Sequence, residues 1–314
     1  MLLSRVAENL YWAARYLERA EDTARIVREH TNLIIDLPTS VPLTWEPLLA
    51  IIGGREEFDA AHEAADELSI VRYLVSDRTN GGSILMSVEQ AREDLRTCRE
   101  VVPREAWQSV NDLYLYVASH HRDGVARPSR SRFLERIVTE SLRTEGFILS
   151  TMSRDEAYEF VRLGRTIERA DMTTRVLDVS AGALMATQAG GGGQYEDVQW
   201  MSVLRSLSAL QMYHRTTRLP VEGPAALRFL LLDAAFPRSV SCCLADVADS
   251  LSRLPRSELV LPACDEARRV VADRRLDDLG AAGLHELADE LQIALAAIHD
   301  HLIATYVQPV TVAF

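Results

Sequence analysis

The chain has 314 residues, of which 47% are apolar, and a formal net charge of −12. This length and composition predict one large or two ordinary domains with a real hydrophobic core. No run of 18 apolar residues occurs, and the amphipathic start is unlike a signal peptide, so we expect a cytoplasmic protein without a membrane span. The negative charge argues against nucleic acid and anionic membranes as main partners. All 34 basic residues are arginine, which excludes lysine Schiff-base, pyridoxal-phosphate and P-loop chemistry.

Helical periodicity runs through the chain, and strand-type alternation is nearly absent, so the predicted fold is all-α. The expected connections include a Pro38–Pro42 break, the Asp123–Ser131 and Leu254–Pro262 segments, and a glycine-rich stretch at Gln188–Tyr195. Residues 308–314 are predicted as a short extended tail. In chain order, the expected helices are 5–35, 45–75, 83–102, 104–121, 130–150, 153–186, 198–217, 223–252, 264–275 and 281–307.

The motif R-x-x-E-R-A-x-x-x-x-R occurs in the first expected helix and again 150 residues later, in the sixth. Each copy lies beside an apolar stripe at helical spacing. Two interpretations stay open: a buried ion-pair network that fixes the bundle register, or a site for an anionic or peptide substrate with Glu18 and Glu168 as catalytic groups. The motif residues are Arg15, Glu18, Arg19, Ala20 and Arg25 in the first copy and Arg165, Glu168, Arg169, Ala170 and Arg175 in the second.

Further correspondences continue the repeat. Trp45 matches Trp200, and a run beginning at Leu74 and containing Asp77 matches one beginning at Leu230 and containing Asp233, at offsets of 155 and 156. We therefore predict an internally duplicated bundle, with halves 1–150 and 151–314 around one core and a pseudo-twofold axis. The two motif helices should pack against each other near the centre. Each motif glutamate should be buried and paired with an arginine, either Arg25 or Arg175 on its own helix or the Arg92–Arg99 helix across a contact.

A second charged cluster lies in the expected helix 83–102. Arg92, Arg96 and Arg99 share one helical face, with Glu93 among them. Three arginines on one face repel each other unless acids or an anion lie between them. The cluster is therefore either a solvated face neutralised by its own glutamates or a face that binds an anion.

The segment Asp233–Ser239 is typical of a helix end, a turn and the start of the next helix. It is either only a turn with a cap, or a turn that also directs Arg238 into an anion site. If the chain has a working pocket, we expect Arg92, Arg96, Arg99 and Arg238 to line it, with Glu18 or Glu168 at its edge.

Signatures of metal and nucleophile chemistry are missing. The eight histidines form neither H-x-x-x-H nor E-x-x-H, and G-x-S-x-G is absent. The cysteines have no C-x-x-C spacing and are expected to fill the core. We therefore predict no metal site and no intrinsic cofactor.

The two Glu-Arg helices, the A-R-E-D-L-R-T-C-R-E segment followed by Trp107 and Asn111, and F-L-L-L-D-x-x-F-P-R-S at Phe229–Ser239 together resemble the bacterial alpha-E family. That family is a helical domain named for its Glu-Arg motif. One departure is visible: the family typically has D-x-x-N-P-S-S-I, whereas this chain has Asp77-Arg-Thr-Asn80-Gly81-Gly82-Ser83-Ile84.

The resemblance implies which genes lie nearby rather than a known reaction. Such proteins are typically encoded beside, or fused to, circularly permuted ATP-grasp proteins, often with a transglutaminase-like peptidase nearby. We therefore expect a helical component of a system that forms or modifies peptide amide bonds, with a peptide substrate and an ATP-grasp partner through which ATP enters. It would act either as an accessory subunit or as a second enzyme on the ligase product. The alternative is a non-catalytic scaffold in which the Glu-Arg pairs only lock the bundle.

Overall fold

The computed structural model describes residues 2–38, 43–181, 195–218, 220–274, 276 and 279–307, with the side chains of 180 and 181 left out. All regular structure in these residues is helical, which confirms the all-α class. Short helical turns of other types are Leu177–Ala181, Ser257–Leu259 and Ile303–Val307. The α-helices are α1 Ser4–Asp36, α2 Glu46–Ile52, α3 Arg55–Ala61, α4 Glu67–Val75, α5 Ile84–Thr97, α6 Arg104–Val125, α7 Arg127–Thr151, α8 Glu156–Val176, α10 Glu196–Ser206, α11 Leu210–Thr217, α12 Gly223–Leu232, α13 Val240–Ser252, α14 Leu261–Ala272 and α15 Ala281–Leu302.

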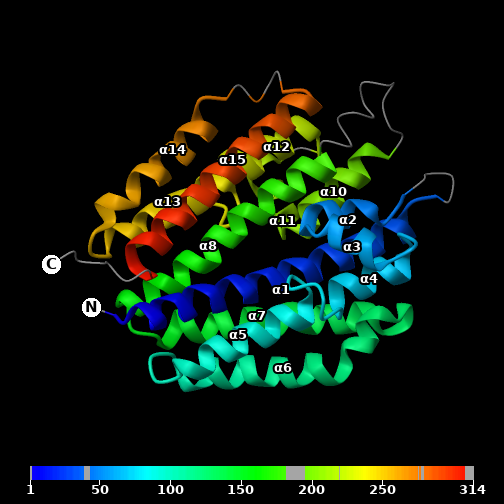
Figure 1. Ribbon diagram of the computed structural model, residues 1–314. Helices are drawn as coiled ribbons and strands as arrows, with labels where there is room; N and C mark the ends of the chain where they lie inside the picture. The colour runs from blue at the N-terminus through cyan, green and yellow to red at the C-terminus, as the bar shows by residue number, and fades with distance from the viewer. Residues whose placement is uncertain are drawn as a thin grey trace.

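Helices α1 and α8 carry the two motif copies and lie side by side through the middle of the molecule (Figure 1). Helices α5 and α7 pack against α1, and α6 covers them both. Helices α13 and α15 pack against α8, with α14 outside them. The buried apolar side chains form one hydrophobic cluster that includes residues from both predicted halves. The predicted contact between the motif helices is therefore confirmed.

Gly164 explains why α1 and α8 approach so closely. A Cβ atom at this position would lie 2.1 Å from the backbone oxygen of Tyr11 on α1. Only glycine fits where one helix backbone meets another at this distance. The contact brings the charged shoulders of both helices within reach of each other.

Several expected helices are divided in the structure. The segment 45–75 forms α2, α3 and α4, because Gly53 and Gly54 adopt φ angles of 88° and 86° and Asp66 begins a new helix with a capping box. The segment 198–217 is divided near Ser208, which has a φ of 54°. The segment 223–252 is divided by the turn that starts at Asp233. Local backbone geometry overrides the apolar periodicity at these positions.

Other connections are shorter than expected. Only Ala126 separates α6 from α7, because Pro128 lies in the first turn of α7, where its missing N–H is tolerated. The expected glycine-rich loop lies largely outside the described residues, as does the predicted tail at 308–314. No described helix has the length and apolar character needed to cross a membrane.

The predicted boundary between halves falls at the end of α7. The turns on either side of the molecule have a common local arrangement. Asp77 accepts a hydrogen bond from the Thr79 amide, and Ser83 donates to the Asp77 carbonyl before capping α5. Asp233 and Ser239 make the same two kinds of bond before α13. The duplication and the division at residue 150 remain predictions that this similarity favours.

Candidate functional site

The motif carboxylates pair across the α1–α8 contact rather than along their own helices. Glu18 receives two hydrogen bonds from Arg169, with Nε–Oε1 2.7 Å and Nη2–Oε2 2.9 Å. Glu168 accepts hydrogen bonds from Nε of Arg15 and Nε of Arg19, both at 2.6 Å. The glutamates are 3% and 1% exposed. Burial and arginine pairing are as predicted, whereas Arg25 and Arg175, the expected partners on the same helix, bind other acids.

Glu18 belongs to a dry charge cluster between α1, α8 and the start of α13. Arg238 is 6% exposed and lies 2.9 Å from Glu18, 2.9 Å from Glu21 and 2.6 Å from Asp22. Arg25 completes the cluster by donating Nε and Nη2 to Glu21. The space beside Glu18 measures about 30 Å³, room for no more than a water or two.

The charges in this cluster are tuned by burial and by the arginines. Burial would raise the pKa of Glu18, but Arg169 and Arg238 outweigh it and lower the pKa to about 2. The pKa of Asp22 is raised to about 8, because burial dominates and Glu18 and Glu21 add repulsion. Oδ2 of Asp22 is buried without a hydrogen-bond partner among the described residues. A Glu18 held ionised by arginines in a dry interior fits the ion-pair lock better than a proton-transfer role.

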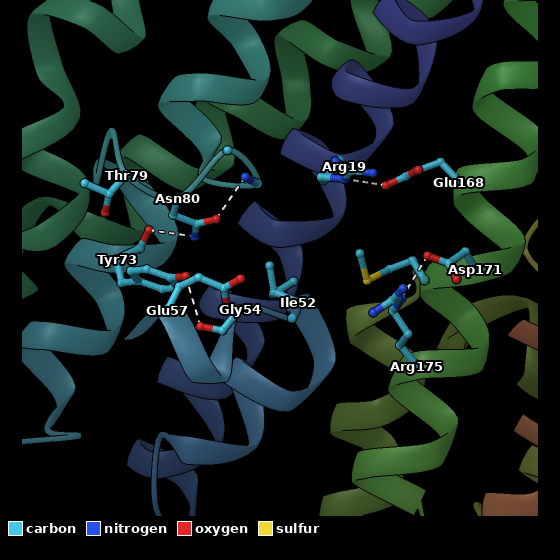
Figure 2. A pocket seen from close by; sticks show the side chains of 14 residues that line it. Arg19, Ile52, Gly54, Glu57, Tyr73, Thr79, Asn80, Glu168, Asp171 and Arg175 are labelled. Carbon is cyan, nitrogen blue, oxygen red and sulfur yellow. Dashed lines mark hydrogen bonds and ion pairs between the residues drawn. The ribbon is translucent and has the colours of Figure 1, made fainter. Parts of the chain in front are cut away.

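The opposite shoulder of α1 and α8, around Glu168, borders an open pocket of about 290 Å³. Figure 2 shows α1 and α8 forming one wall, with Arg19, Glu168, Asp171 and Arg175. The other wall comes from the segment between α2 and α5. Its lining residues are Ile52, Gly53, Gly54, Glu57, Tyr73, Thr79, Asn80, Gly81 and Gly82.

Two arginines on the helical wall are held by carboxylates of α8 through Nε alone. Arg19 Nε lies 2.6 Å from Glu168, and Arg175 Nε lies 2.8 Å from Asp171. Their side chains are 24% and 33% exposed. Among the described residues, no carboxylate pairs with their terminal nitrogens. Each guanidinium is therefore oriented by one carboxylate and keeps donors for a bound anion.

The second wall is shaped by hydrogen bonds within the chain. Tyr73 donates its hydroxyl to the carbonyl of Gly54, and a Cβ at Gly54 would lie 2.4 Å from that hydroxyl oxygen. Asn80 donates to the carbonyl of Tyr73 and accepts from the amide of Gly82. These bonds fix the α2–α3 turn and the α4–α5 loop against each other, so the wall is preorganised.

Glu168 orients arginines and is poorly suited to general base catalysis. Burial would raise its pKa, but Arg15 and Arg19 lower it below the usual range. Each of its oxygens already accepts a short arginine bond. The predicted catalytic role of Glu18 and Glu168 remains a hypothesis, and the geometry favours positioning of Arg19 as the role of Glu168.

The expected arginine pocket with Arg92, Arg96, Arg99 and Arg238 is wrong. Arg238 is buried in the Glu18 cluster, whereas Arg96 is exposed on α5 and Arg99 is exposed in the turn after it. Glu93 pairs with both Arg92, at 2.5 Å, and Arg96, at 2.8 Å. Arg92 also donates to Asn111 and lies over the ring of Tyr114. The sequence pattern could not separate these sites, because all four arginines have the same chemistry and differ only in what packs over them.

The remaining predicted residues have structural partners. Arg165 binds Glu145 of α7 with Nη1–Oε1 2.6 Å. Asp233 accepts hydrogen bonds from the amides of Ala235 and Phe236, so it forms the turn that places Arg238 in the interior. The turn-and-cap interpretation of this segment is therefore correct.

Four residues line the pocket that the sequence pattern did not predict as site residues: Gly53, Gly54, Glu57 and Tyr73. The adjacent glycines inside the expected helix 45–75 were the available signal of a turn. Asn80 lies in the motif where the chain departs from the family pattern. It lines the pocket, and its side-chain amide is hydrogen-bonded to the Tyr73 carbonyl and the Gly82 amide.

One group of side chains in the described part of the chain has metal-ligand types within 4.8 Å of one another: Asp178, His285 and Asp289. His285 and Asp289 are largely exposed, and His285 Nδ1 lies 2.8 Å from Asp178. Exposed groups of this kind are common without an ion. The expectation of no metal site remains a prediction.

Comparison with known proteins identifies relatives of the whole chain. The uncharacterized proteins Rv2567 of Mycobacterium tuberculosis and Mb2597 of Mycobacterium bovis are each 24% identical over 330 residues, which cover 95% of this chain and 35% of the relative. The chain thus spans about a third of the length of these relatives. No solved structure matches. The model of the Alpha-E family, described as a predicted alpha-helical domain with a conserved ER motif, matches residues 2–307, so the chain belongs to the Alpha-E family.

Proposed function

We propose that this protein is the peptide-binding helical component of a system that forms or modifies peptide amide bonds, and that it works with an ATP-grasp ligase partner. The pocket beside Glu168 is its binding site. The observation that carries the proposal is the pair of oriented arginines, Arg19 and Arg175, facing a pocket of about 290 Å³. Oriented guanidinium groups are the usual means of binding a carboxylate or phosphate.

The composition of the pocket favours binding over covalent catalysis by this chain. Its lining residues include no cysteine, serine, histidine or lysine. The hydroxyl of Tyr73 donates to the carbonyl of Gly54, which is not a base. The hydroxyl of Thr79 donates to Oδ1 of Asp77, an oxygen that also accepts the Thr79 amide and so holds the turn. In this proposal the partner uses ATP to activate a carboxyl group, and this chain holds the peptide or the ligase product.

The length of the relatives supports a partner. About two thirds of each of these mycobacterial relatives lies outside the region that this chain matches. In these relatives the helical module is continuous with further sequence, which supports an association of this module with another domain or protein. We propose an ATP-grasp protein as that partner and a transglutaminase-like peptidase as a further member, in the cytoplasm.

The Glu18 cluster favours a second candidate function, a scaffold without a substrate. Its acids and arginines pair with one another in the interior. If the Glu168 side served the same purpose, the pocket would be only a surface depression. The two candidates differ in one respect: only the binding function requires terminal nitrogens of Arg175 that the fold itself does not use.

The test is a reconstitution with a candidate ATP-grasp partner, ATP and peptide acceptors, with product measured by mass spectrometry. Loss of one charge-assisted hydrogen bond corresponds to about 1.5–3 kcal/mol, so Arg175→Gln should lower product formation about tenfold or more. Because Arg175 is at the pocket surface, the melting temperature of the Arg175→Gln variant should differ little from that of the wild type. Arg268→Gln, at an exposed position of α14, is the matched control and should retain activity.

Two results would contradict the proposal. Unchanged product formation by folded Arg175→Gln would leave the scaffold function. Loss of product formation in Arg96→Gln but not in Arg175→Gln would move the working surface to α5.

A further inference from the structure

Opposite uncompensated charges lie at the two walls of the pocket. Beside the helical wall, Arg15, which does not line the pocket, shares the carboxylate of Glu168 with Arg19, so these three side chains carry one surplus positive charge. Asp171 balances Arg175, which lies lower on the same wall. The two arginines and two carboxylates that line the helical wall balance each other, so the surplus positive charge comes from Arg15 beside the wall. The wall itself presents the terminal nitrogens of Arg19 and Arg175.

Glu57 supplies the opposite charge on the facing wall. It lies on α3, is exposed, and lines the pocket beside Gly54 and Tyr73 (Figure 2). No arginine or histidine of the described residues forms an ion pair with Glu57. Arg55, its neighbour in sequence, is engaged by Asp59 and Glu46. An unpaired carboxylate thus faces a wall of arginines, and no side chain of the described residues pairs the two.

From this arrangement we infer that the pocket binds a dipolar ligand, a short peptide or peptide end with both a free carboxylate and a free ammonium group. The carboxylate binds at Arg19 and Arg175, and the ammonium group lies toward Glu57. This inference rests on the proposed function and specifies its substrate class. A purely anionic ligand would gain from the arginines but would be repelled by Glu57, and a purely cationic ligand would meet the reverse.

The size of the pocket agrees with a ligand of a few residues. Its volume of about 290 Å³ lies at the lower end of the roughly 300–1,000 Å³ that is usual for small-molecule sites. The backbone at Gly53 and Gly54 keeps this wall close to Arg175: a Cβ at Gly53 would lie 3.8 Å from Nη1 of Arg175. A pocket of this volume has room for a short peptide end.

The experiment measures binding of four probes to the purified chain by calorimetry: alanyl-alanine, its C-terminal amide, its N-acetyl form, and inorganic phosphate. For the wild type, the free dipeptide should bind at least about tenfold more tightly than either blocked form, because each block removes one charge pairing worth about 1.4 kcal/mol or more. Phosphate should bind more weakly than the free dipeptide.

Two variants assign each preference to a side chain. Arg175→Gln should bind the free dipeptide and its amide about equally, while it still prefers a free amino group over an acetylated one. Glu57→Gln should lose the amino-group preference and keep the carboxylate preference. Glu56→Gln, an exposed neighbour outside the pocket, is the control and should retain both preferences. Both positions are solvent-accessible, so the variants should fold.

Equal binding of all three peptides by the wild type, phosphate binding as tight as dipeptide binding, or no binding of any probe would overturn the dipolar ligand. The proposed function fails differently. Selective dipeptide binding without any effect of Arg175→Gln on product formation would contradict the role with the ATP-grasp partner but leave the ligand class in place. Loss of product formation in Arg175→Gln without dipeptide selectivity would do the opposite.

Discussion

Asp22 makes the stability of the fold depend on pH in a way that one substitution can isolate. In the folded protein its pKa is raised from 3.8 to about 8, chiefly by burial and also by repulsion from Glu18 and Glu21. The native state therefore holds a proton on Asp22 at pH values where the unfolded chain has released it. Stability from this group is complete below about pH 4 and is lost as pH rises through about 8.

The size of the effect follows from that pKa. At about 1.4 kcal/mol for each tenfold change in proton affinity, the full loss is on the order of 5 kcal/mol between pH 4 and 8. About 2–3 kcal/mol of it falls between pH 6 and 9. Asp22→Asn imitates the protonated acid, since Oδ1 can still accept the hydrogen bond from Arg238 and the buried Oδ2 position has no donor to lose.

Urea unfolding at pH 6, 7, 8 and 9 measures the difference. Wild type and Asp22→Asn should have similar stability at pH 6, and the variant should be about 2–3 kcal/mol more stable at pH 9. His30 does not interfere, because burial lowers its pKa to about 4. Parallel stability curves for the two proteins would refute the reasoning, as would a variant already destabilised by several kcal/mol at pH 6.

Three further predictions concern the lock, the helix contact and metals. Glu18→Gln should destabilise the fold by about 3–5 kcal/mol in urea unfolding, since Arg169 and Arg238 lose their shared carboxylate. Because the pKa of Glu18 in the folded state is about 2, its contribution to stability is present above about pH 4.5 and is lost on acidification. Equal unfolding midpoints of wild type and variant at pH 7 would exclude the ion-pair lock. Gly164→Ala should lower stability by about 1–3 kcal/mol or more in thermal unfolding, because the new Cβ would clash with the Tyr11 carbonyl. The control Gly146→Ala, whose Cβ meets open space on α7, should be neutral or stabilising by up to about 1 kcal/mol. A neutral Gly164→Ala would disprove the close helix contact. Elemental analysis should find no stoichiometric transition metal; zinc that raises the melting temperature of the wild type but not of His285→Ala would identify Asp178, His285 and Asp289 as a metal site.

The sequence by itself determined the helical class, the position of the two motif helices and the fact that their glutamates are buried beside arginines. These features follow from local rules. Apolar residues at 3,4 spacing form a stripe, and a carboxylate at its shoulder requires a charged partner when buried. The cap at Ser239 and the turn at Asp233 were also predictable, because a few neighbouring residues specify them.

Pairing across the helix contact could not be predicted in this way. Glu21–Arg25 and Asp171–Arg175 pair along one helix, as their spacing predicts. Glu18 and Glu168 pair with the other helix instead, because Gly164 sets the depth and register of the α1–α8 contact. Register depends on backbone approach over the whole helix length, and no local pattern contains it.

Only the tertiary structure decided which shoulder of the α1–α8 pair is open. The two motif copies have the same residue types, yet one carboxylate lies in a dry cluster and the other borders a pocket. The difference comes from distant segments: Arg238 fills the space beside Glu18, whereas the α2–α5 segment stands off from Glu168. Whether a charged side chain pairs with its neighbours or stays available to a ligand depends on which segments pack over it. That is a property of the assembled fold rather than of the motif.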